Sequence, residues 1–344
     1  MIPTATTMAT PVRLTANLHP SFLSRRDTRH RPSLNRRRQA LWKSRSAAFP
    51  KYAARRVVGV RAAGTDTASG ESSASANSGK SLTYTAYEGN SWGVQFTQTG
   101  VRLLTDPWLV GDLTFADIDW LYKGVKRTKP QGSVSDVTLG VDFLLISQGL
   151  DDHAHRPTLK QLDKALPVVC SPTAAEVCRE LGFKTVISLK AGQSCEMCDG
   201  KISITASAGA LVGPPWSTRE AGFVVKENVP NGVSLYYEPH CDHDFFDIRK
   251  IGTVDVVVSP AVSVDVGSFP LVKGYDGIVE LARVLRPATI IPLLNADIEQ
   301  EGVLAQVVTS RGTVQELPTL LRKNGMGSIQ VVIPEPLKPM VVNI

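Results

Sequence analysis

The chain has 344 residues, of which 42% are hydrophobic, and a formal net charge of +6. No run approaches the roughly eighteen uncharged apolar residues that a transmembrane helix needs, so no transmembrane segment is expected. The five cysteines are odd in number and unevenly spaced, which argues against a disulfide framework.

The first 63 residues differ in charge from the rest of the chain. They contain 14 of the 38 Lys and Arg residues but only one, Asp27, of the 32 acidic residues, so the remainder has seven more acids than bases. A segment rich in Arg, Ser, Thr and Ala and poor in acids is typical of an organellar transit peptide. Its Ser and Thr content and the stretch VRAA at residues 60–63 favour the chloroplast stroma over the mitochondrion. A basic arm that binds nucleic acid is the competing interpretation, but the Arg residues have no interleaved aromatic residues.

The next residues, 64–81, are mostly small and polar and show no apolar periodicity. Such a composition cannot bury enough surface to order itself, which predicts a disordered linker. Residues 82–344 then remain, and their abundant Val, Leu and Ile are sufficient for one large domain with a substantial core.

The domain begins with three short apolar segments at residues 82–87, 93–97 and 101–105, separated by Gly-Asn and Thr-Gly pairs. This pattern predicts an antiparallel meander. Strands and helices are then expected to alternate, beginning with a buried strand at residues 141–147 (VDFLLIS). The predicted helices are 157–166, 172–181 and 277–285, and the remaining predicted strands are 167–170, 185–189, 201–206, 222–226, 234–237, 254–258 and 289–292. This order predicts an α/β fold whose sheets are covered by helices, and a four-layer αββα sandwich if two sheets pack together.

All four histidines beyond residue 30 fall in two short clusters, DDHAH at residues 151–155 and EPHCDHD at residues 238–244. Proteins combine imidazoles and carboxylates in this way to hold a divalent metal ion or to form an acid/base pair. The two clusters therefore predict the functional site. Asp106, which precedes a proline, is interpreted instead as a residue that caps a turn.

Two motifs carry a resemblance to a known family. TDPW at residues 105–108, followed by the strand VDFLLIS and then SQGLDDH at residues 147–153, resembles the metallo-β-lactamase-fold hydrolases, particularly their lactonase-like branch. The signature of that family at this strand end is S-H-x-H-x-D-H. The resemblance extends over residues 82–334 and implies the four-layer αββα sandwich, with the chain as a plastid-targeted plant or algal member of the superfamily.

The chain departs from that signature at most of the metal-binding positions that the resemblance implies. Asp152 and His153 are retained, whereas the other positions carry Gln148, Leu150, a residue near Ala208–Ala210, His240, and Leu293 or Leu294 followed by Asn295. One of the two metal positions has thereby lost its nitrogen donors. We therefore do not expect a mechanism that uses two metal ions. The second position keeps Asp152 and His153 and gains His240, and three protein ligands with an open water position is the usual arrangement of catalytic zinc.

We therefore predict one divalent ion, which is zinc, iron or manganese, bound by Asp152, His153 and His240. His155 and His243 are each expected to be a further ligand or to lie behind the ligands. Glu238 or His243 is expected to transfer protons, with the alternative that Glu238 only orients a ligand. Two alternatives stay open: a metal-free site that uses the same residues, and histidines that only form hydrogen bonds within their loops.

Two kinds of function follow from these residues. The first is hydrolysis of an ester, lactone or thioester by a water molecule that a metal ion activates. The second is a binding or assembly protein without catalytic activity, which holds a small molecule or a plastid protein partner in the cleft. Nucleic acid is not expected as a partner because residues 64–344 are acidic overall. The aromatic residues at 108–126 are expected either to line the pocket or to belong to the core.

Overall fold

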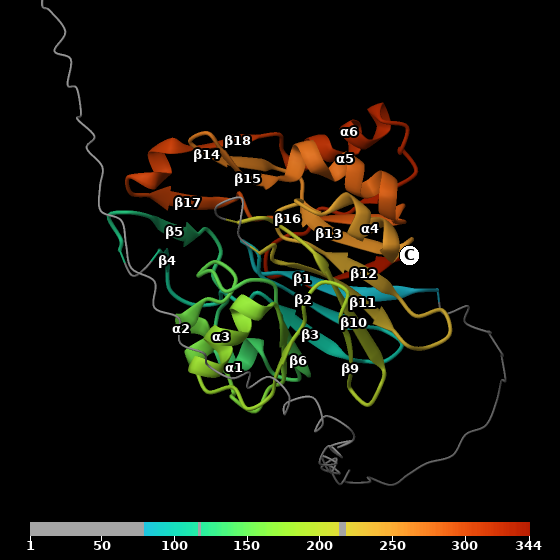
Figure 1. The fold of residues 1–344 in the computed structure, drawn as a ribbon, viewed down its shortest axis with the longest axis horizontal. Coiled ribbons are helices and arrows are strands. Elements are labelled where there is room, and N and C mark those ends of the chain that lie inside the picture. Colours follow the sequence, from blue (N-terminus) through green and yellow to red (C-terminus); the bar gives the residue numbers. More distant parts are fainter. Residues whose placement is uncertain (1–78, 116–117, 213–217) are drawn as a thin grey trace, which may run out of the picture. The chain divides into compact units, whose positions relative to one another are not determined.

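The computed structural model describes residues 79–115, 118–212 and 218–344, all within one compact unit, Ser73–Ile344 (Figure 1). The predicted transit peptide and most of the predicted linker lie outside the described residues. The first strand begins at Ser81.

Two seven-stranded sheets form the centre of this unit. The first has the order β20-β1-β2-β3-β6-β7-β8, antiparallel from β20 to β3 and parallel from β3 to β8. Its strands are β1 (Ser81–Ala86), β2 (Trp92–Phe96), β3 (Arg102–Thr105), β6 (Phe143–Ile146), β7 (Val168–Cys170), β8 (Val186–Ser188) and β20 (Met340–Asn343). The predicted meander is thus confirmed, and the last strand of the chain pairs with its beginning.

The second sheet has the order β19-β16-β13-β12-β11-β10-β9, antiparallel from β9 to β12 and parallel from β12 to β19. Its strands are β9 (Ser194–Met197), β10 (Ile202–Ala208), β11 (Ala221–Glu227), β12 (Ser234–Tyr237), β13 (Val256–Pro260), β16 (Thr289–Leu293) and β19 (Gln330–Val331). Side chains from both sheets, among them Trp92, Phe143, Phe223 and Tyr237, share one buried hydrophobic cluster. The two sheets therefore pack face to face.

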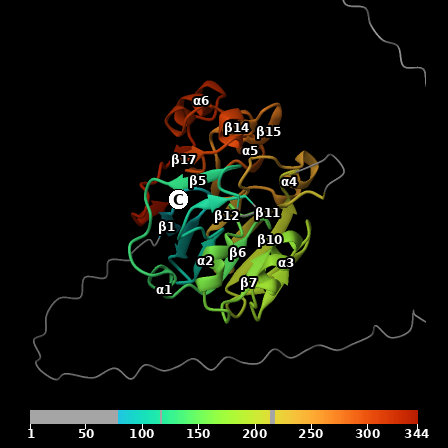
Figure 2. The ribbon, with the colours of Figure 1, turned by 90° about the vertical axis from the view of Figure 1, so that its left-hand side faces the viewer.

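Helices cover the outer face of each sheet (Figures 1 and 2). A second buried cluster joins α1 (Val134–Val137), α2 (Arg156–Gln161) and α3 (Pro172–Glu180) to the first sheet. A third joins α4 (Phe245–Ile251), α5 (Gly274–Leu285) and α6 (Leu317–Lys323) to the second. This arrangement confirms the predicted αββα sandwich. None of the helices in the described part of the chain is long and apolar enough to cross a membrane.

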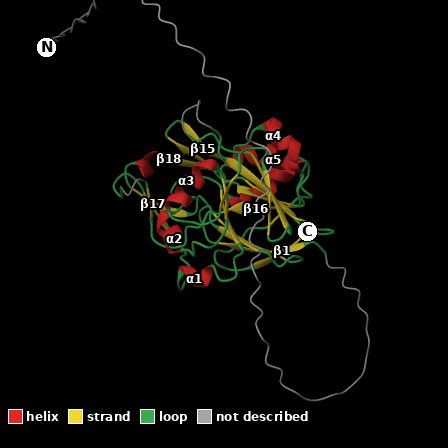
Figure 3. Ribbon diagram, turned by 60° about the horizontal axis from the view of Figure 1, so that its bottom comes forward, coloured by secondary structure: helices red, strands yellow, loops and turns green. Residues whose placement is uncertain are grey.

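Two three-stranded sheets that we did not predict lie together at one edge of the sandwich (Figures 1 and 3). One contains β14 (Ser263–Val266), β15 (Phe269–Lys273) and β18 (Val308–Arg311). The other contains β4 (Leu113–Thr114), β5 (Lys123–Lys126) and β17 (Ile298–Glu301). The 3-10 helix η1 (Leu304–Val307) lies between β17 and β18, and η2 (Val314–Glu316) lies between β18 and α6. Residues of both small sheets line a cavity that is described below.

Candidate functional site

Several loops that follow the carboxyl ends of central strands meet at one edge of the sandwich. Asp106 follows β3, Ser147 follows β6 and Glu238 follows β12. This edge is where α/β folds commonly place their ligands. The two histidine clusters come together here, since the ring centroids of His153 and His240 are 5.3 Å apart.

Asp106 is the centre of a buried hydrogen-bond network. Its Oδ1 accepts from the Ser147 backbone N–H at 2.7 Å, and its Oδ2 accepts from the hydroxyls of Ser147 and Tyr237 at 2.5 and 2.6 Å. The Nδ1 atom of His153 lies 2.7 Å from the same Oδ2. Asp106 does occupy a sharp bend, with a φ of 41°, but its carboxylate joins both sheets to His153. The interpretation of Asp106 as a turn cap overlooked this second role.

His153 is fully buried between two carboxylates. Its Nδ1 faces Asp106, and its Nε2 is 3.2 Å from Asp152 Oδ2. Burial alone would lower the pKa of His153, but the charges of Asp152 and Asp106 outweigh it and raise the pKa to about 10. The two carboxylates therefore favour a positive charge between them, which either a proton on Nε2 or a metal ion would supply.

Asp152 lies at the border between this network and open space, with 27% of its side chain exposed. Burial would raise the pKa of its carboxyl group, but the neighbouring His153 holds that pKa below its ordinary value. Asn90 Nδ2 donates to Asp152 Oδ2 at 3.2 Å and lies 3.3 Å from His153 Nε2. Asn90 was not predicted as a site residue because the Gly-Asn pair indicated only a turn.

His240 is buried on the other side of the site. Its Nδ1 is 2.8 Å from the Gln148 side-chain nitrogen, and burial together with the charge of His153 lowers its pKa to about 3. The imidazole is therefore neutral near pH 7, with Nδ1 able to accept from Gln148 and Nε2 able to carry the proton. Within the described residues, no hydrogen bond joins His240 to Asp152 or His153.

Of the other three predicted site residues, His155 and His243 lie away from this group, whereas a carboxylate oxygen of Glu238 is 3.9 Å from His240 Nδ1. His155 is held by the Thr158 hydroxyl at 2.9 Å, and burial lowers its pKa to about 4. Glu238 accepts from the backbone N–H groups of His240 and Asp242 at 3.2 and 2.9 Å, so it fixes the loop that carries His240. His243 Nε2 lies 3.9 Å from a carboxylate oxygen of Glu280, beside α5.

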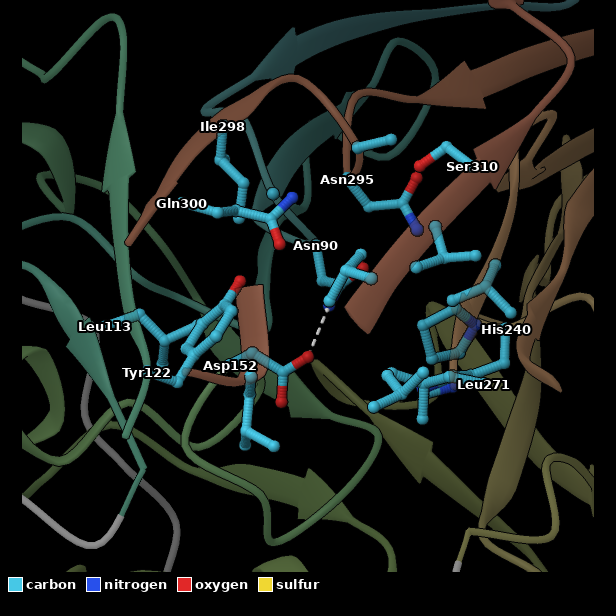
Figure 4. A pocket seen from close by; sticks show the side chains of 18 of the residues that line it. Asn90, Leu113, Tyr122, Asp152, His240, Leu271, Asn295, Ile298, Gln300 and Ser310 are labelled. Atoms are coloured by element: carbon cyan, nitrogen blue, oxygen red, sulfur yellow. Dashed lines mark hydrogen bonds between the residues drawn. The ribbon is translucent and has the colours of Figure 1, made fainter. Parts of the chain in front are cut away.

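A cavity of about 120 Å³ opens between the loops and the two small sheets. Figure 4 shows Asn90 and Asp152 between Tyr122 on one side and His240 on the other. The apolar walls come from Trp108, Leu113, Phe115, Tyr122, Val264, Val266, Leu271, Val272, Ile298, Leu304 and Val308, and the polar residues include Asn90, Asp152, His240, Asn295, Gln300 and Ser310. Three of the expected aromatic residues thus line the cavity, whereas Trp120 is 70% exposed.

Two donors near the cavity have the spacing that one metal ion requires of its ligands. Within the described part of the chain, no three His, Cys, Asp or Glu side chains converge as a metal-binding group. Asp152 Oδ2 and His153 Nε2 nevertheless have the spacing of two neighbouring ligands of one ion, at 3.2 Å. A carboxylate on the second nitrogen of a metal-binding histidine, as Asp106 provides here, is the usual support for such a ligand.

Comparisons with known proteins agree with this fold. A family model described as a β-lactamase superfamily domain matches residues 83–294. A metal-dependent hydrolase of Thermoplasma acidophilum is 24% identical over 200 residues, which cover 55% of this chain and 84% of that protein.

Two solved structures show the same fold at low sequence identity. A possible metal-dependent hydrolase from Veillonella parvula is 16% identical, with a TM-score of 0.55, and the match covers 78% of this chain and all of the other. An isothiocyanate hydrolase from Delia radicum gut bacteria is also 16% identical, with a TM-score of 0.54, over 76% of this chain and 99% of its own. The chain therefore belongs to the metallo-β-lactamase superfamily.

Proposed function

We propose that the protein is a single-metal hydrolase that cleaves a small ester, lactone or thioester with an apolar acyl group. The observation that carries this proposal is the pair of Asp152 Oδ2 and His153 Nε2, 3.2 Å apart, with Asp152 among the residues that line an apolar cavity. The metal-dependent hydrolase from Thermoplasma acidophilum also supports it. Bound at this pair, a divalent ion would polarise the substrate carbonyl and lower the pKa of a water molecule.

The residues around the pair would prepare the site for this chemistry. Asp106 fixes the orientation of His153 through Nδ1, and the Ser147 and Tyr237 hydroxyls in turn fix Asp106. Because the site is built on strand ends of both sheets, its geometry is set by the packed core. The neutral His240 would donate from Nε2 to the carbonyl oxygen, where negative charge develops during the reaction.

The cavity limits the size and polarity of the substrate. A cavity of similar size, on the order of 150 Å³, that is lined by apolar side chains holds a molecule such as benzene, and the present one is about 120 Å³. An acyl group of that size would fit against Leu113, Tyr122 and Leu271. Water oxygen would then bond to the carbonyl carbon, the carbon–oxygen or carbon–sulfur bond would break, and the leaving alcohol or thiol would take the proton.

Hydrolysis by the full chain can be followed with short-chain thioesters, aryl esters and lactones in the presence of Mn²⁺ or Zn²⁺. We expect Asp152→Asn to reduce kcat/KM by about 100-fold or more, since it removes a charged ligand of the ion. Asp199→Asn is the matched control, because Asp199 is exposed in the turn between β9 and β10. Equal activity of wild type and Asp152→Asn would refute the proposal.

A second candidate is a binding protein without catalytic activity that uses the same cavity. It is favoured by the absence, within the described residues, of any converging group of three His, Cys, Asp or Glu side chains. A binding protein would show no turnover of any substrate with either ion. It would, however, lose affinity for its ligand when the cavity is filled, for example by Leu271→Trp.

The location of the protein is a further part of the proposal. The Arg-rich composition of residues 1–63 supports import into the chloroplast stroma. A substrate of the proposed enzyme would then be a plastid metabolite, and a protein partner, if one exists, a plastid protein.

A further inference from the structure

Asn90 is held directly above the Asp152–His153 pair by an unusual turn. The turn between β1 and β2 places both Glu88 and Gly89 in the left-handed region, with φ values of 57° and 59°. Gly89 forms an isolated β-bridge with Leu294, which ties the turn to the end of the second sheet. The backbone that carries Asn90 is therefore tied to both sheets.

Three side-chain atoms form an almost equilateral triangle at this point. The Asn90 amide nitrogen lies 3.2 Å from Asp152 Oδ2 and 3.3 Å from His153 Nε2, and those two atoms are 3.2 Å from each other. When ligands lie about 2.0–2.1 Å from a tetrahedral ion, neighbouring ligand atoms are about 3.3 Å apart. The triangle thus has the dimensions of one face of a coordination tetrahedron.

In this structure the Asn90 amide presents its nitrogen, not its oxygen, to the pair, so a ligand role requires the amide to turn over. Oδ1 is buried and, within the described residues, has no hydrogen-bond partner, which is an unfavourable state for a buried acceptor. A half-turn about the Cβ–Cγ bond exchanges the two ends of the amide and brings Oδ1 to the corner of the triangle. Both ends occupy nearly the same volume, so the exchange requires no movement of the turn.

We propose that Asn90 is the third protein ligand of the ion, beside Asp152 and His153. This inference rests on the proposed function, because it assumes that the pair binds an ion. One carboxylate, one amide oxygen and one imidazole form a harder ligand set than a site made of histidines. Such a set suits manganese or iron(II) as well as zinc.

Isothermal titration of the full chain with Mn²⁺ alone, and separately with Zn²⁺ alone, tests this assignment without reference to activity. We expect one equivalent to bind wild type and Asn90→Ala to weaken binding at least tenfold, since one of three ligands is lost. Asn90→Asp, which keeps the shape and restores an oxygen donor, should bind at least as tightly as wild type. Gln300→Ala is the matched control, because it removes another amide from the cavity wall and should leave affinity within twofold.

Three other results would overturn the assignment. If Asn90→Ala remains folded and binds the ion as tightly as wild type, Asn90 is not a ligand, although the proposed function stands. If Asn90→Ala binds more tightly, the amide N–H groups block the pair instead of completing it. If wild type binds neither ion and Asp152→Ala gives the same trace, both the ligand assignment and the proposed function fail.

Discussion

At the scale of single residues, the site depends on one carboxylate that the sequence pattern did not single out. Asp106 receives hydrogen bonds from Ser147, through both its backbone and its hydroxyl, and from Tyr237, and it holds the Nδ1 side of His153. These groups come from β12 and from the loop after β6, so they connect the two sheets. When a buried carboxylate has this many partners, the loss of any one of them is expected to lower the stability of the folded protein.

We expect Asp106→Asn to lower the free energy of unfolding by about 3 kcal/mol, because the amide cannot accept all four hydrogen bonds and leaves His153 with one carboxylate. Ser147→Ala, which removes a single hydroxyl donor, should lower it by about 1–2 kcal/mol. Urea denaturation of the three proteins gives both values. An Asp106→Asn variant as stable as wild type would show that the network does not support the fold.

At the scale of elements, the sequence predicted the strands and helices of the sandwich because their apolar residues are continuous or periodic. β6 reads FLLI and β13 begins with VVV, and both are buried. In the two small sheets, β17 (IEQE) and β18 (VTSR) escaped prediction because they are largely polar. These strands are defined by pairing between distant segments, such as β5 with β17, which no local pattern reveals.

Local sequence patterns also predicted only part of the site. The His and carboxylate clusters pointed to Asp152, His153 and His240 because those residue types are uncommon together. Asn90 and Asp106 gave no comparable signal, since Asn beside Gly and Asp before Pro are ordinary turn residues. Their roles depend on the fold, which brings together the loops after β1, β3, β6 and β12. The fold also places His155 and His243 away from that point, where they contact Thr158 and Glu280 instead.

Lys126, the last residue of β5, connects this strand to the loops that contain Tyr87 and Trp108. It is only 4% exposed, and its ammonium group donates to the backbone carbonyls of Tyr87 and Trp108. Burial lowers the pKa of Lys126 from its ordinary value of 10.5 to about 7. Between those two pH values the unfolded chain binds one more proton at this residue than the folded chain, so stability rises with pH across that interval.

Lys126→Met removes this titration. We therefore expect the difference in unfolding free energy between wild type and Lys126→Met to grow as the pH increases. From about pH 7.5 to pH 10 the unfolding free energy of wild type, relative to the variant, should rise by up to about 1.4 kcal/mol per pH unit. Denaturation curves of both proteins at four pH values measure this slope. A difference that does not change with pH would mean that Lys126 stays charged in the folded protein.

At the scale of the whole molecule, the charge of the chain has two separate origins. Residues 1–63 are strongly basic, whereas residues 64–344 carry an excess of acids. A positive overall charge therefore gives no reason to expect nucleic-acid binding by the folded unit. The folded unit instead has the architecture of the metallo-β-lactamase superfamily.

Fusing residues 1–63 to a fluorescent protein tests the proposed location. We expect the fusion to enter chloroplasts, and replacing Arg36, Arg37 and Arg38 with Glu to reduce import, because transit peptides contain few acids. Fluorescence in mitochondria or in the cytosol would contradict the chloroplast assignment.

The most direct test of the central claim is anomalous diffraction from crystals of the protein soaked in Mn²⁺. We predict one anomalous peak at about 2.0–2.3 Å from Asp152 Oδ2, His153 Nε2 and the amide oxygen of Asn90. A map without a peak at this triangle, with the Asn90 amide still bridging Asp152 and His153, would contradict the account and leave the cavity as a binding site without a metal ion.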